Sequence, residues 1–155
     1  MSLNIIERYA IASELLLLKA RINIIIEATD LSPKMLRKAF IDMHKISPSR
    51  GSMKFNSNFI YRSFSRTKEV TLFVFFFRIE THDNFTLRCI SAYRRYDTYI
   101  TTIQNVRPEL DFSDAWIIAK WVECGILKLV KCSHCRSAKL INNVQVQNTC
   151  CVCKR

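Results

Sequence analysis

The sequence predicts a mostly α-helical fold, a helical bundle followed by a small C-terminal segment that carries cysteines. The 155 residues include only 2 Gly and 3 Pro, which leaves few residues for the tight turns of an all-β sandwich or barrel. With 49% hydrophobic residues, a chain of this length builds a core without disulfide bonds. Turn residues divide the chain, so we expect a helical domain over residues 1–106 and a helix with the cysteine-bearing segment over 107–155.

The first block of the chain, to about Lys45, has apolar runs that do not fit one helix face. Residues 15–18 are four consecutive leucines and residues 24–26 are three isoleucines. An α-helix turns about 100° per residue, so neither run can face a single core. A helix that is apolar all round is buried on several sides, and in a domain this small we expect a partner chain to cover it.

A helix-turn-helix layout follows the isoleucine run. Ser32 is a good N-cap and Pro33 a good first helical residue, so a second helix begins after a short turn. Met35, Leu36, Ala39, Phe40 and Met43 share one face of this helix, and Lys34, Arg37, Lys38 and Lys45 lie off it.

A basic face at the start of a helix can approach DNA phosphates and major-groove edges. The predicted DNA-contacting residues are Ser32, Lys34, Arg37 and Lys38, with Arg50 and Lys54 on the following loop. The alternative is an ordinary helical hairpin with a solvated charged face. Contacts to phosphates alone would position the protein without reading base sequence.

The middle block contains the segment whose secondary structure is hardest to predict. Residues 70–77 are rich in β-branched and aromatic side chains, which favours a buried strand. The helical flanks and the scarcity of turn residues favour a helix instead. The last block is clearer: residues 115–123 have helical spacing, Ser113 and Asp114 lie near the start, and Gly125 can end the helix.

The chain is strongly basic, with 24 Lys and Arg against 13 Asp and Glu and a net charge of +11. The excess is spread along all three blocks, and such a field favours polyanions, of which nucleic acid is the commonest in a cell. A merely basic soluble protein is the alternative. No membrane span and no secretory signal are expected, since the most apolar run has eight residues and the first residues lack a basic-then-apolar order. We therefore expect a cytoplasmic protein with reduced cysteines or cysteine metal ligands.

Two Cys-x-x-Cys pairs, Cys132 with Cys135 and Cys150 with Cys153, are separated by 14 residues. Two such knuckles supply four thiolates to a tetrahedral Zn²⁺ ion, and four thiolates leave no open position for catalysis. We expect one structural zinc per chain that stabilises the terminal segment. Cys151 and His134 lie inside the knuckles and are alternative ligands or neighbours of the site. Cys89 and Cys124 are expected in the core.

No catalytic constellation accompanies these motifs. The three histidines, His44, His82 and His134, lack a nucleophile pattern, and the chain has no Gly-rich phosphate loop. We therefore expect a protein that is not an enzyme.

Several segments together resemble the FlhC family, the C subunit of the flagellar master transcriptional activator. Residues 115–129, followed by Cys132-x-x-Cys135, resemble that family's Ala-Trp helix, its turn and its first knuckle. Residues 50–55 resemble its basic-Gly loop, and residues 92–96 its Ala-Tyr-Arg helix.

The resemblance implies a mostly helical subunit that binds promoter double-stranded DNA and activates flagellar operons. It implies a D-type partner subunit, in a heterohexamer of two C and four D subunits, and RNA polymerase with the housekeeping sigma factor. It also implies that Cys132, Cys135, Cys150 and Cys153 are the zinc ligands, that residues 70–77 are helical, and that assembly covers the leucine helix. This chain departs from the family in ending two residues after Cys153.

Two other functions fit part of the pattern. A zinc-containing protein-interaction module without sequence-specific DNA binding would use the knuckle and the leucine helix to bind partners. An RNA-binding ribbon protein would stack bases on aromatic side chains and prefer single strands. Steep salt dependence of binding would favour phosphate contacts over the interaction module.

Overall fold

The structure, a computed structural model, describes residues 3–54, 56–144 and 149–155, and it is mostly helical as predicted. The helices are α1 (Ile5–Leu17), α2 (Ile22–Thr29), α3 (Pro33–His44), α4 (Phe64–Ile79), α5 (Phe85–Thr98) and α6 (Phe112–Glu123), with a 3₁₀ turn η1 (Ser57–Tyr61) and a π-helical turn η2 (Tyr99–Ile103). Two strands, β1 (Leu127–Lys131) and β2 (Ala138–Asn142), form one antiparallel sheet.

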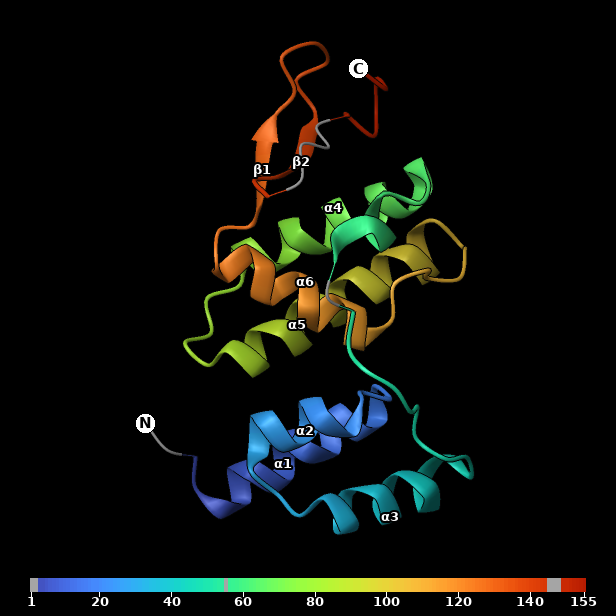
Figure 1. Cartoon of the computed structure of the whole chain (residues 1–155), viewed down its shortest axis with the longest axis vertical. Coiled ribbons are helices and arrows are strands. Elements are labelled where there is room, and N and C mark those ends of the chain that lie inside the picture. The colour runs from blue at the N-terminus through green and yellow to red at the C-terminus, as the bar shows by residue number, and fades with distance from the viewer. Residues whose placement is uncertain (1–2, 55, 145–148) are drawn as a thin grey trace.

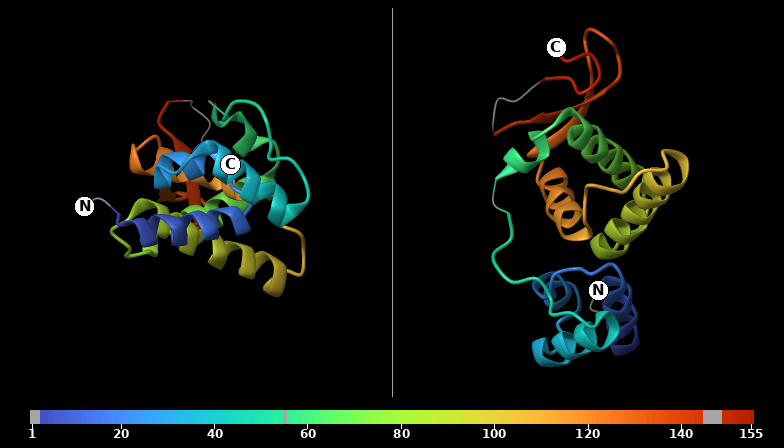
Figure 2. Two further views of the ribbon diagram at one scale, coloured as in Figure 1. Left: turned by 90° about the horizontal axis from the view of Figure 1, so that it is seen from below. Right: turned by 90° about the vertical axis from the view of Figure 1, so that its right-hand side faces the viewer.

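The elements form three parts along the longest axis of the molecule (Figure 1). Helices α1, α2 and α3 occupy one end, α4, α5 and α6 pack together in the middle, and the β1–β2 ribbon with the chain's C-terminus forms the other end. Figure 2 gives the same order from the side, with the segment between α3 and η1 running along the body. Contacts between α1 and α5 join the first part to the second, so α3 and the ribbon lie at opposite ends.

Helices α1 and α2 bury most of the leucine and isoleucine runs inside the chain. A capping box starts α1, in which Asn4 and Glu7 exchange two side-chain-to-backbone hydrogen bonds of 2.9 Å. Leu15 and Leu16 are buried because α1 contacts both α2 and α5, whereas Leu17 is 58% exposed. The expectation that a partner covers the whole leucine run is therefore too broad, since other helices of the chain cover most of it.

Helices α2 and α3 form the predicted helix, short turn, helix. Asp30 ends α2 in the left-handed conformation (φ 54°), Leu31 is buried in the turn, and α3 begins at Pro33. Ser32 occupies the N-cap position but its side chain makes no capping hydrogen bond. At the other end of α3, His44 Nε2 donates to the Leu16 carbonyl at 2.7 Å, which ties α3 to α1.

Helix α4 contains the segment with strand-like composition. Ser63 caps it by accepting from the Arg66 amide at 3.1 Å. Val70, Phe73, Val74 and Phe77 are all buried, at the spacing of one helix face. Burial of this face against α5 and α6 outweighs the β propensity of the side chains.

Helix α6 runs through the middle of the core, and all eight residues 112–119 are buried. Asp111 caps it by accepting from the Asp114 amide at 2.7 Å, and Gly125 (φ 73°) follows its end as predicted. The ribbon comes directly after α6. Its strands are a feature that the sequence analysis missed, and they pack on α4 through Leu127 and Leu140, which are buried. None of the described helices is long and apolar enough to cross a membrane.

Candidate nucleic-acid interface and metal centre

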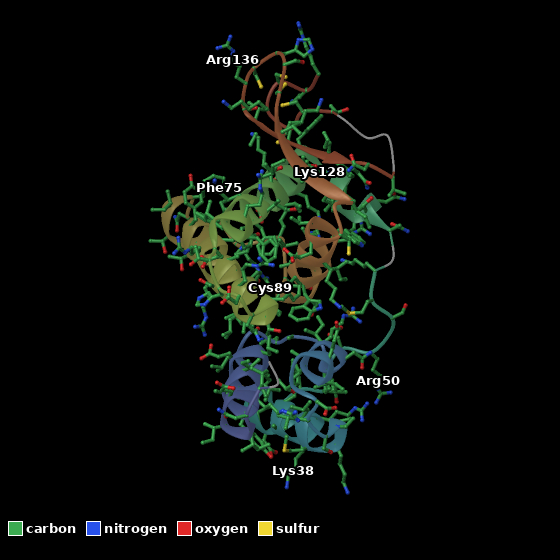
Figure 3. The ribbon with its side chains drawn as sticks, turned by 90° about the vertical axis from the view of Figure 1, so that its left-hand side faces the viewer. Lys38, Arg50, Phe75, Cys89, Lys128 and Arg136 are labelled. Carbon is green, nitrogen blue, oxygen red and sulfur yellow. The ribbon has the colours of Figure 1, made fainter. Side chains whose placement is uncertain are left out.

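The basic residues predicted on α3 lie on its solvent side. Leu36 and Phe40 are buried against the body, and Lys34, Arg37 and Lys38 are exposed. Figure 3 shows Lys38 at the far end of the molecule, pointing away from the body. Because Pro33 fixes the start of α3, all three cations lie within its first two turns. The residues of the predicted apolar face are buried or partly buried except Met43, which is 43% exposed near the end of the helix.

A cavity of about 500 Å³ opens beside this face, between the start of α2, the middle of α3 and the loop after it. Three arginines, Arg21, Arg37 and Arg50, line it together with Ser47 and Ser49. Arg37 and Arg50 form no ion pair or hydrogen bond among the described residues, so their guanidinium groups are available to an anion.

Arg21 is a residue of this surface that the sequence analysis missed. Its guanidinium Nη1 donates to the carbonyl oxygens of Gly51 and Ser52, at 3.1 and 3.4 Å, and so holds the basic loop against α2. Its backbone amide donates to the Ser113 hydroxyl at 3.1 Å. No local pattern marks Arg21, because the partners of its guanidinium group are 30 and 31 residues away in the sequence.

Lys54 lies apart from the α3 cations and has partners of its own. Its Nζ donates to the Asp114 carboxylate at 2.6 Å and lies 4.4 Å from the centre of the Phe59 ring. Arg66 donates to the same carboxylate at 2.8 Å. Asp114 is buried, so these two cations neutralise a charge inside the protein. The charge of Lys54 is therefore shared with Asp114, whereas those of Lys34, Arg37 and Lys38 are free among the described residues.

The four cysteines of the two knuckles come together at the tip of the ribbon, where Cys132 and Cys135 lie on the loop that joins β1 to β2. Their sulfur atoms all lie within 4.8 Å of one another. Sγ of Cys132 is 3.7 Å from that of Cys153, and Sγ of Cys135 is 3.7 Å from that of Cys150. These separations are far longer than the about 2.0 Å of a disulfide bond, and all four thiols are free. Four close, free thiols could hold a metal ion.

The hydrogen bonds of the cluster favour two thiolates. Ser137 Oγ lies 2.8 Å from Cys135 Sγ and lowers the pKa of that thiol. At Cys150 burial raises the pKa, but backbone amides and the Ser137 hydroxyl outweigh it and bring the pKa to about 6. At Cys153 a backbone hydrogen bond from Arg155 lowers the pKa, but burial and the neighbouring thiols raise it to about 11. Near neutral pH, ionisation of the Cys153 thiol therefore needs a cation beside it.

The other sulfur and imidazole groups lie outside this cluster. Cys151 is buried, and His134 is exposed on the first knuckle. Cys89 is buried in the helical core as expected. Cys124 is exposed, contrary to expectation, because it is the C-cap residue of α6 and follows the buried part of that helix.

Comparison with known proteins gives one family over nearly the whole chain. The model of the FlhC family, described as flagellar transcriptional activator, matches residues 3–155. Among curated proteins named flagellar transcriptional regulator FlhC, that of Enterobacter cloacae is 23% identical over 153 residues, which cover 96% of this chain and 80% of the relative. That of Gallionella capsiferriformans is 25% identical over 152 residues (95% and 83%), and that of Verminephrobacter eiseniae 29% over 134 residues (84% and 70%).

Proposed function

The chain belongs to the FlhC family of flagellar transcriptional activators, which are regulators and not enzymes, and from this premise we propose that it is a zinc-containing, DNA-binding subunit of a hetero-oligomeric activator of flagellar operons. The observation that carries the proposal is the family match over residues 3–155. The partners in this proposal are promoter duplex DNA, a D-type subunit, and RNA polymerase with the housekeeping sigma factor.

The DNA-binding surface in this proposal is the exposed side of α3 with the adjoining loop. Lys34, Arg37 and Lys38 project from the first two turns of a helix that follows a short turn, which is how a recognition helix presents its residues to the major groove. Ser32 precedes these residues, and Arg50 adds a cation from the loop beyond α3. We expect Lys54 to act indirectly, since its contact with Asp114 anchors this loop to α6.

The metal in this proposal is one structural Zn²⁺ held by Cys132, Cys135, Cys150 and Cys153. The edge of a tetrahedron with Zn–S bonds of about 2.3 Å is about 3.8 Å long, and two sulfur pairs are separated by 3.7 Å. A bound zinc ion supplies folding free energy to the terminal segment and has no open position for a substrate. The proposal puts the protein in the cytoplasm, where such thiols stay reduced.

Exposed apolar residues on α1 support assembly with a partner. Ile6 is 77% exposed and Leu17 58% exposed, and their spacing of 11 residues puts them about 20° apart around the helix. Ile5 and Tyr9 are exposed beside Ile6. We propose that the D-type subunit covers this side of α1, which is the part of the leucine helix that the chain itself leaves open.

The proposal is tested by binding to a flagellar promoter duplex in a gel-shift assay, with and without a co-expressed D-type subunit. We expect salt-sensitive binding that requires the partner, with a preference of about a thousandfold or more over a scrambled duplex, and about one zinc per chain in the same preparation. Zinc without selective binding under either condition would contradict the proposal and favour a protein-interaction module.

A further inference from the structure

The β1–β2 ribbon carries a concentration of positive charge that the α3 surface does not account for. From residue 124 to residue 155 the sequence has no Asp or Glu and six basic residues, which are Lys128, Lys131, Arg136, Lys139, Lys154 and Arg155. This segment therefore contributes +6 to a net charge of +11.

The strand register brings two of these cations to the same face of the sheet. Lys128 is paired with Ile141 and Lys139 with Val130, so the two lysines are diagonal neighbours on one side. The opposite side carries Leu127 and Leu140, both of which are buried. Like charges on neighbouring strands repel, and an anion bound between them would relieve the repulsion.

These cations also lack the acidic partners that several arginines of the helical part of the chain have. Arg88 pairs with Glu123 at 2.5 Å, and Arg95 pairs with Glu80 at 2.8 Å. Within the described part of the chain, neither Lys128, Lys139 nor Arg136 has a carboxylate at ion-pair distance. Arg136 lies at the tip of the ribbon, at the opposite end of the molecule from Lys38 (Figure 3).

The metal site accounts for only part of this charge. A Zn²⁺ ion with four thiolates has a formal charge of 2 − 4 = −2. Six basic residues in the segment would leave +4 after this charge is balanced. The solvent-facing lysines also project from the strands, whereas all four ligands lie on the loops outside β1 and β2.

We propose that the ribbon surface, defined by Lys128, Arg136 and Lys139, is a second contact with the phosphate backbone of duplex DNA. The proposal rests on the proposed function, because it adds a surface for the same ligand. Residues 124–155 contain no Phe, Tyr or Trp. Single-stranded nucleic acid is bound by aromatic stacking and protein partners by buried aromatic anchors, so a surface with cations alone favours the duplex backbone.

This second contact would have a different role from α3. Cations that contact only phosphates fix the position of the protein on the duplex and add affinity, but they do not select a sequence. Since α3 and the ribbon lie at opposite ends of the molecule, one duplex that contacts both follows the length of the protein.

The test uses the full zinc-loaded chain with its D-type partner, and measures the affinity for a flagellar promoter duplex at several salt concentrations. The variant K128Q/R136Q/K139Q removes three proposed contacts. The slope of log affinity against log salt is negative, and each lost phosphate contact makes it shallower by about 0.9. We therefore expect the magnitude of the slope to decrease by about 2 to 3. The preference for promoter over scrambled duplex should remain.

The matched control is K19Q/R62Q/R107Q, which removes the same charge from exposed residues outside both surfaces. We expect its slope to change by less than about 1. Zinc content and melting temperature are measured on both variants. If Arg136→Gln disturbs the first knuckle, the double variant K128Q/K139Q is measured instead. We expect it to decrease the magnitude of the salt slope by about 2.

Equal salt slopes for the ribbon variant and the wild type would overturn the inference. Equal decreases of the slope in the ribbon variant and the control variant would also overturn it, because they would reflect net charge alone. Loss of RNA polymerase binding with an unchanged DNA slope would also overturn it and assign the ribbon to a protein partner. If the wild type bound no DNA under any partner condition, the proposed function would fail first. If Lys34, Arg37 and Lys38 were needed but the ribbon cations were not, this inference alone would fail.

Discussion

Seven cysteines occur in the chain, and their surroundings separate them into two groups. Cys132, Cys135, Cys150 and Cys153 share one cluster. Cys151 is adjacent to a member of that cluster, but burial raises the pKa of its thiol, although a hydrogen bond with Thr71 opposes this. A thiol in those surroundings resists the ionisation that metal binding requires.

Single cysteine substitutions test this division. We expect Cys153→Ser to reduce zinc from about one per chain to a small fraction, because three thiolates and a hydroxyl no longer form the tetrahedral sulfur set. Cys151→Ser and Cys124→Ser should still bind about one zinc per chain, since neither sulfur belongs to the cluster. Elemental analysis of the purified proteins measures this. Loss of zinc in Cys151→Ser with retention of zinc in Cys153→Ser would show that Cys151, and not Cys153, is a ligand of the second knuckle.

At this scale, features that depend on local spacing could be predicted, and features that depend on distant partners could not. The cysteine spacing predicted a set of four residues that the structure does bring together. The environment of Lys54 could not be predicted, because its carboxylate partner is 60 residues further along the chain. Asp114 resembled a residue that merely starts a helix, yet it is a buried anion held by two cations.

Among the elements, α4 separates local propensity from tertiary packing most clearly. In a helix, Phe73 and Phe75 lie about 200° apart, and the structure buries Phe73 completely while Phe75 is 48% exposed. The Phe73 ring contacts those of Phe77 and Tyr96, with centres 6.2 and 6.4 Å away. In a strand, residues 73, 75 and 77 would instead face the same side.

Alanine substitutions distinguish these two structures. Phe73→Ala should lower the free energy of unfolding by about 3–5 kcal/mol, because it leaves a cavity in the core. Phe75→Ala should change it by less than about 1 kcal/mol, since that ring already faces solvent. Urea unfolding followed by circular dichroism measures both. Similar large losses for both variants would contradict the helical register of α4.

The β1–β2 ribbon was not predicted, although its first strand contains a sequence signal. Leu127, Lys128 and Leu129 alternate between apolar and charged, and alternation with a period of two is typical of a half-buried strand. The family resemblance tipped the assignment of residues 70–77 toward helix, whereas propensity alone favoured a strand. Helix α6 was predicted without it, because its N-cap, spacing and terminal glycine are all local.

In the molecule as a whole, the relative positions of the basic side of α3 and the cysteine cluster could not be predicted from the sequence. Amphipathic patterns predict that a helix buries a face, but they do not say against which element. Packing of α1 on α5 puts α3 at one end, and packing of the ribbon on α4 puts the cysteine cluster at the other. The division at residue 106 stays a prediction.

This separation has a functional consequence. A charge change on α3 is far from the cysteine cluster and leaves its thiols and their hydrogen bonds intact. DNA binding and metal binding should therefore be separable by substitution, although both belong to one folded chain.

Promoter binding by Arg37→Glu tests whether α3 is the DNA-binding surface. It is measured by gel shift with the D-type subunit present, and zinc is assayed on the same protein. Arg37 is exposed and unpaired among the described residues, so the substitution should leave the fold and the zinc content unchanged. We predict at least a tenfold loss of promoter affinity, because a cation facing phosphates becomes an anion. The matched variant Arg107→Glu, which makes the same change at another exposed site, should bind as the wild type does. Unchanged binding by Arg37→Glu, or equal losses in both variants, would contradict the assignment of α3 as the DNA-binding surface.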